Sequence, residues 1–241
     1  MAAGMYDWNR RNLEGLDALA VELRAHPRLR LLGDYCGLRS RGPRRQALAA
    51  LEQFLELSSR FGGAEARAAA LDLLELHGRT KEAYQLLAQP LLARFLFPVL
   101  ETWMEDEPES ITPLRWLGFL KHRDDLLARA LAMAPDDLPV RRRLVERTLH
   151  HINHATHHLD ESFFIGSVDE TVEDLKNLGA YIEGAPDPVI FAAAAGELRY
   201  FETLVADWIA FSREGAGSFP AWCAQRQRKY RFAAKYDYGS R

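Results

Sequence analysis

Apolar side chains recur at helical spacing along nearly the whole chain, and this periodicity limits the fold more than any other feature. No short run alternates Val, Ile, Thr and aromatic residues between turn signals, as a half-buried strand would. We therefore predict an all-α protein of about 10–11 helices, packed as stacked antiparallel hairpins in an α-solenoid-like or irregular helical bundle. The predicted helices cover residues 7–25, 28–40, 44–61, 64–77, 80–104, 111–121, 123–134, 138–160, 168–183, 187–213 and 219–236.

Two prolines interrupt the most apolar part of this pattern. Pro90 and Pro98 lie within the predicted helix 80–104, where each removes a backbone donor and crowds the preceding turn. We expect this segment to bend or to divide into two helices.

The length and composition are those of a self-contained globular protein. A chain of 241 residues can bury its own core, so we expect one domain over residues 1–241, with possible halves at 1–110 and 111–241. Two cysteines are too few for a disulfide framework and fit a reduced compartment. The most apolar run, 86–100, is shorter than the ~20 residues that cross a bilayer. We expect a cytoplasmic protein with no membrane span.

The segment 101–149 carries small, apolar and proline residues at offsets that are typical of helical repeats. These residues are Pro108, Leu114, Leu117, Gly118, Ala130 and Pro135. The segment resembles degenerate tetratricopeptide repeats, although its two prolines are closer together than the family's period of about 34 residues. The resemblance implies a solenoid that binds a protein or peptide, and it implies no catalytic residues.

A dense histidine cluster, HHINHATHHL at residues 150–159, is the most distinctive local motif. On a helix over 138–160, the apolar stripe gathers Val145, Leu149, Ile152, Thr156 and Leu159. The opposite, polar face is predicted to contain Arg143, Arg147, His150, His154, His157 and His158, and to end at Glu161. This face is either an ordinary solvated surface or a site that recognises an acidic or aromatic partner. Because histidine ordinarily titrates near pH 6.5, such a site would gain positive charge on mild acidification.

The same histidines have a second interpretation, as metal ligands. His150 and His154, like His154 and His158, are four residues apart, which places two imidazoles on one side of a helix. Such a site would hold a divalent metal such as zinc and would define a metal-dependent helical-bundle enzyme. In bundle metalloproteins the ligands project inward, whereas here they project away from the apolar stripe. We therefore expect no metal or other cofactor and keep the zinc site as the alternative.

Basic and aromatic residues alternate near the C-terminus, in the predicted helix 219–236. The residues concerned are Arg226, Arg228, Lys229, Tyr230 and Arg231. Such a pattern can bind a phosphate backbone and stack on bases, which would make the chain a nucleic-acid-binding regulator. The commoner explanation is a terminal amphipathic helix that packs its aromatic rings on the core. A net charge of −3 also gives no general attraction to nucleic acid.

The sequence contains no phosphate-binding glycine loop, nucleophile elbow or C-x-x-C motif. We therefore expect a non-enzymatic adaptor, scaffold or immunity-type protein that recognises another protein through its polar helical surface. Arginine is strongly preferred over lysine, which is typical of a bacterial source. The sequence does not indicate the oligomeric state.

Overall fold

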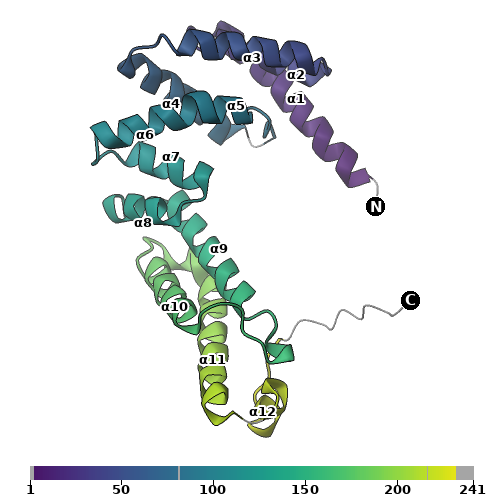
Figure 1. Ribbon diagram of the computed structural model, residues 1–241, viewed down its shortest axis with the longest axis vertical. Coiled ribbons are helices and arrows are strands. Elements are labelled where there is room, and N and C mark those ends of the chain that lie inside the picture. Colours follow the sequence, from purple (N-terminus) through teal and green to yellow (C-terminus); the bar gives the residue numbers. More distant parts are fainter. Residues whose placement is uncertain (1–2, 81, 216, 232–241) are drawn as a thin grey trace. The chain divides into compact units, whose positions relative to one another are not determined.

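The computed structural model describes residues 3–80, 82–215 and 217–231, with side chains from residue 10 onward. Helices dominate these ranges and no strand occurs in them, so the all-α prediction is confirmed (Figure 1). Contacts between residues divide the chain into two compact units, Met1–Lys121 and His122–Arg241. The boundary between the units therefore lies after residue 121, whereas the predicted halves meet between residues 110 and 111. Among the described residues, no helix is long and apolar enough to cross a membrane.

The first unit is a series of antiparallel helices around a leucine-rich core. Leu23, Leu32, Phe54 and Leu73 are all fully buried there. Its elements are α1 (Ala3–Ala25), α2 (Arg30–Arg41), α3 (Arg44–Ser58), α4 (Gly63–Arg79), α5 (Gln89–Leu91), the π-helical turn η1 (Leu92–Leu96), α6 (Phe97–Asp106) and α7 (Ile111–Lys121).

The prediction of one helix over 80–104 is wrong in its first third. Residues 82–88 form turns, and the helix begins at Gln89, because Pro90 fits a first helical turn, where amide donors have no intrahelical partner. Pro98 lies just after η1, in which the amide of Phe97 bonds to the carbonyl of Leu92, five residues back. This shift of register accommodates the missing amide of Pro98 within a continuous helix.

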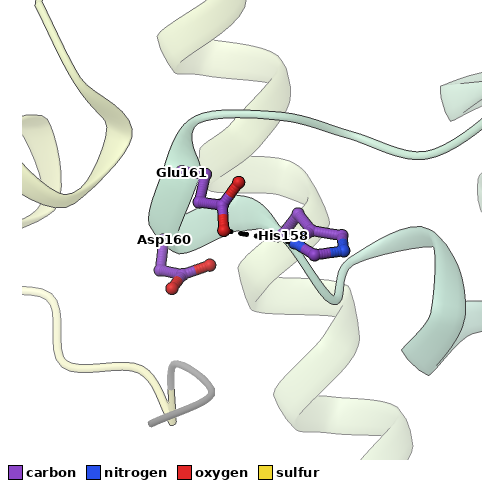
Figure 2. Close-up of side chains that lie close together, drawn as sticks. All are labelled: His158, Asp160 and Glu161. Carbon is purple, nitrogen blue, oxygen red and sulfur yellow. Dashed lines mark ion pairs between the residues drawn. The ribbon is translucent and has the colours of Figure 1, made fainter. Parts of the chain in front are cut away.

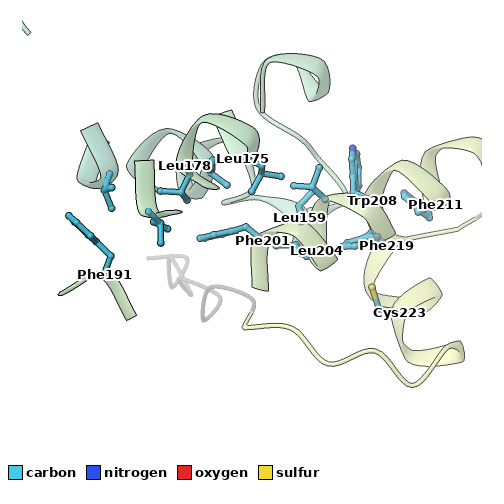
Figure 3. Close-up of a cluster of buried hydrophobic side chains, with 14 of the residues drawn as sticks. Leu159, Leu175, Leu178, Phe191, Phe201, Leu204, Trp208, Phe211, Phe219 and Cys223 are labelled. Carbon is cyan, nitrogen blue, oxygen red and sulfur yellow. The ribbon is translucent and has the colours of Figure 1, made fainter. Parts of the chain in front are cut away.

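In the second unit α11 packs against α9, α10 and α12, and α8 packs against α9. A buried cluster of leucine and aromatic side chains joins α10, α11 and α12 (Figure 3), and includes Leu178, Phe201, Trp208 and Phe219. Its elements are α8 (Asp124–Met133), α9 (Leu138–Ala155), the 3₁₀ turn η2 (Leu159–Glu161), α10 (Val168–Glu183), the 3₁₀ turn η3 (Pro188–Phe191), α11 (Ala192–Glu214) and α12 (Phe219–Gln225).

Two helices of this unit end earlier than the sequence predicts. The prediction of a helix over 138–160 is wrong beyond Ala155, because the backbone leaves helical geometry at Thr156, with a ψ of 2°, and the chain then turns into η2. The prediction over 219–236 is wrong beyond Gln225, since Gln227 adopts a positive φ of 57°. Residues 232–236 of that prediction lie outside the described ranges.

Candidate functional site

The exposed face of α9 carries two of the predicted histidines. His150 and His154 are exposed, whereas Ile152 between them is fully buried. Val145, Thr156 and Leu159 are also buried, so the predicted apolar stripe and the outward direction of His150 and His154 are confirmed. This arrangement follows from the helical period, which places residues four apart on one face.

The two predicted arginines of this face contact the start of α8. The guanidinium Nε of Arg147 lies 2.5 Å from the Oδ1 atom of Asp124, and the Arg147 side chain is only 24% exposed. Arg143 contacts the imidazole Nδ1 of His122 at 3.3 Å. Arg147 therefore holds α9 against the start of α8, and Arg143 contacts the turn before it, so both arginines are less accessible to a partner than the sequence suggests.

His151, which the sequence analysis left out of the polar face, interacts with α10. Burial raises the pKa of Asp174 on that helix, and the nearby charge of His151 opposes the shift. Glu170 and Asp124 raise the pKa of Asp174 further by like-charge repulsion. Asp174 is half-buried and His151 is exposed, so their interaction is a charge effect at the surface between α9 and α10.

His157, His158 and Glu161 do not continue the α9 face, so their predicted place on that helix is wrong. They follow Ala155, in the turn that contains η2, and the rings of His157 and His158 meet edge to face with centroids 4.8 Å apart. His158 Nδ1 lies 3.5 Å from Glu161 Oε1 (Figure 2). His157 instead points to a groove between α9 and α11.

This groove, which we call the α9–α11 groove, has an apolar floor and a polar rim. Its volume is about 360 Å³. The floor is formed by Phe201 and Leu204, which are 5% and 4% exposed. The full lining consists of Asn153, Thr156, His157, Glu197, Tyr200, Phe201, Leu204 and Arg231. The groove thus brings together His157 and Arg231, which the sequence analysis assigned to two separate candidate sites.

Arg231 is held at the rim by α11. Its guanidinium makes two hydrogen bonds to the carboxylate of Glu197, at 3.0 and 2.7 Å, and lies 4.1 Å from the centroid of the Tyr200 ring. The backbone amide of Arg231 also donates to the hydroxyl of Tyr200 at 3.0 Å. The hydrogen bonds from Arg231 lower the pKa of Glu197, so this carboxylate stays charged at mildly acidic pH.

Residues 226–231, which we call the C-terminal strap, run back along α11 after α12. Arg226 pairs with Glu214 at 2.7 Å, and Arg228 with Asp207 at 3.1 Å. Arg231 completes the series with Glu197. Three of the four basic residues that suggested nucleic-acid binding therefore have carboxylate partners on α11, whereas Lys229 is exposed.

Tyr230 fixes the centre of the strap. Its hydroxyl donates to the carboxylate of Asp207 and lies 3.3 Å from the carbonyl oxygen of Thr203, and its ring stacks on Phe219. Burial and the hydrogen bond to Asp207 raise the pKa of Tyr230 far above its ordinary value. The aromatic part of the motif packs on the core, as the amphipathic interpretation expects, but as an extended strap instead of a helix.

Replacing Asp207 with asparagine should loosen the strap. Asp207 is 8% exposed and is the acceptor that Tyr230 and Arg228 share, so the neutral amide loses the ion pair and weakens the hydrogen bond. We expect trypsin to cleave the strap about tenfold faster, equivalent to about 1.4 kcal/mol of lost docking free energy. Glu202→Gln, an exposed position on the same helix, serves as the control. Equal cleavage rates for the two variants would show that Asp207 does not hold the strap.

Asn153, Glu197 and Tyr200 line the groove although the sequence does not predict them as site residues. None of them belongs to a recognisable motif, and they meet Arg231 only because the strap returns along α11. Comparisons of the chain with protein families, with curated proteins and with solved structures found no match.

Proposed function

We propose that this chain is a protein-binding module, not an enzyme, and that it recognises a segment of a partner protein in the α9–α11 groove. The observation that carries the proposal is the composition of the groove, in which an apolar floor lies beneath side chains that can donate hydrogen bonds. Its volume of about 360 Å³ is near the lower end of the range for ligand pockets, which suits one aromatic side chain of a peptide.

The surroundings of the groove favour an acidic partner segment. Asn153 and His157 on the rim can donate to carboxylates or carbonyls, and the exposed His150 and His154 extend this surface along α9. Arg231 is already paired with Glu197, so the imidazoles are the remaining basic groups of this surface. We expect affinity for an acidic segment to rise as the pH falls from about 7.5 to 5.5.

Within this proposal the module is an adaptor, scaffold or immunity-type protein of a bacterial cytoplasm. The helical hairpins of residues 101–149, which resemble tetratricopeptide repeats, suit such a role, because that family binds peptides without catalysis.

A displayed peptide selection against the full chain tests the proposal. We expect the enriched peptides to place an aromatic or large apolar residue beside Asp or Glu. Asn153→Trp puts a bulky ring at the rim of the groove and should weaken binding of these peptides about tenfold or more.

The matched control is Glu146→Trp, which adds the same ring at an exposed position two turns earlier on α9, outside the groove lining. This variant should bind the selected peptides as the unchanged chain does. Peptides that bind equally well to both variants would show that the groove is not the recognition site.

A further inference from the structure

The turn η2 gathers three side chains that ligate metals. His158, Asp160 and Glu161 each offer one ligand atom, and the three atoms lie within 4.8 Å of one another (Figure 2). In a 3₁₀ turn, side chains three residues apart lie one above the other, which brings His158 over Glu161. Among the described residues, no other group of three His, Cys, Asp or Glu side chains meets this geometry.

The backbone of this turn is fixed before any ligand binds. Leu159 is 1% exposed and anchors η2 in the core. Ser162, with a φ of 59°, ends the turn, and its hydroxyl accepts a hydrogen bond of 2.8 Å from the amide of Phe219 at the start of α12. The amide of Phe163 returns to the carbonyl of His158 at 3.1 Å. Only side-chain rotations would therefore be needed to close a site around an ion.

The electrostatics of the cluster call for a cation. Asp160 and Glu161 are two carboxylates at adjacent positions, and the imidazole of His158 is the one basic group in the cluster. The Oδ1 atom of Asp160 is buried, yet no donor of the described chain reaches it. A buried carboxylate oxygen without a hydrogen-bond partner carries a desolvation cost of about 1–3 kcal/mol or more, which a bound cation would remove.

The donor set favours a transition-metal ion, and one of its ligand pairs already has suitable spacing. Zinc binds imidazole nitrogen and carboxylate oxygen at about 2.0–2.2 Å, so two ligand atoms of a tetrahedral site lie about 3.3–3.6 Å apart. His158 Nδ1 and Glu161 Oε1 are 3.5 Å apart. An imidazole ligand also favours zinc over Mg²⁺ or Ca²⁺, which prefer oxygen ligands alone. The Glu161 side chain is largely exposed, which leaves room for water at the fourth position.

We infer that His158, Asp160 and Glu161 form a zinc-binding site on the turn η2. This inference goes beyond the proposed function and does not depend on it. It also differs from the zinc site that the sequence suggested, because His150 and His154 lie on α9 and are not among the three ligands. A bound ion would stiffen the turn that also carries His157 of the α9–α11 groove.

Calorimetric titration of the untagged, metal-stripped full chain with ZnCl₂ tests the inference. We expect one equivalent of Zn²⁺ to bind, and Asp160→Asn and Glu161→Gln each to weaken that binding about tenfold or more. These replacements keep the shape of exposed or half-exposed side chains, so the fold should persist. The control is the double variant His150→Gln/His154→Gln, which removes the four-residue histidine pair of α9 and should bind zinc unchanged.

Amide hydrogen exchange provides a second readout that does not depend on the heat of binding. Zinc should slow exchange across residues 156–165 in the unchanged chain and in the His150→Gln/His154→Gln control, but not in Asp160→Asn. Zinc binding that vanishes in the histidine double variant and persists in Asp160→Asn and Glu161→Gln would overturn the inference, as an adventitious ion on α9 only. The absence of stoichiometric binding by the unchanged chain would overturn it as well.

Discussion

Replacing Gly33 with alanine should lower the free energy of unfolding of the first unit by about 2–3 kcal/mol. Gly33 lies on α2 where this helix crosses α1. A Cβ atom at this position would lie 2.7 Å from the backbone amide nitrogen of Arg24 and 3.0 Å from the carbonyl oxygen of Ala20. Backbone atoms cannot rotate aside, so the two helices must separate and loosen the contacts of Leu23 and Leu32.

Gly37→Ala, one turn later on the same helix, is the matched control. Here the added Cβ meets the end of the flexible Arg24 side chain, which can turn away into solvent. Alanine also favours a helix over glycine by about 1 kcal/mol, so this variant should be as stable as the unchanged chain or slightly more stable. Urea unfolding followed by circular dichroism measures both effects. If both variants unfold at the same urea concentration, α1 and α2 do not pack as closely as described.

Replacing Arg141 with methionine should cost about 3 kcal/mol of stability in the second unit. Arg141 is 3% exposed, and its guanidinium donates to the carbonyl of Tyr181 at 2.6 Å and to that of Pro135 at 2.7 Å. Tyr181 belongs to the last turn of α10, where free carbonyls and the helix dipole favour a positive charge. Methionine fills much of the space but leaves both carbonyls without a donor.

The neighbouring Arg142 gives a control of the same chemistry. Arg142 is exposed, so Arg142→Met should change the unfolding free energy by no more than about 0.5 kcal/mol. Thermal unfolding of the two variants compares a buried and an exposed guanidinium on one helix. A similar loss of stability for both variants would mean that the removal of a positive charge causes it, and not the loss of the hydrogen bonds from Arg141 to the two carbonyls.

The fold was largely predictable from local sequence signals, and the errors have local physical causes. The period of Val145, Ile152 and Leu159 places the buried side of the predicted helix correctly, even though Leu159 lies in η2 and not in α9. Pro90 could have marked a helix start, because a proline in the first turn loses no intrahelical hydrogen bond. The end of α9 at Ala155 has no such signal, because neither glycine nor proline occurs between Ala155 and Glu161.

The candidate site was less predictable, because its parts are distant in the sequence. Arg147 is held by Asp124, and Arg231 by Glu197 and Tyr200, and none of these pairs has a characteristic spacing. The sequence singles out the histidines and the C-terminal basic residues as two separate candidate sites. That His157 and Arg231 line one groove follows only from the strap's path along α11.

The affinity of one selected peptide for the unchanged chain, for Asn153→Trp and for Glu146→Trp tests the central claim most directly. Fluorescence anisotropy should give the same Kd for the unchanged chain and for Glu146→Trp, and a Kd about tenfold higher or more for Asn153→Trp. The same Kd for all three proteins would contradict recognition in the α9–α11 groove.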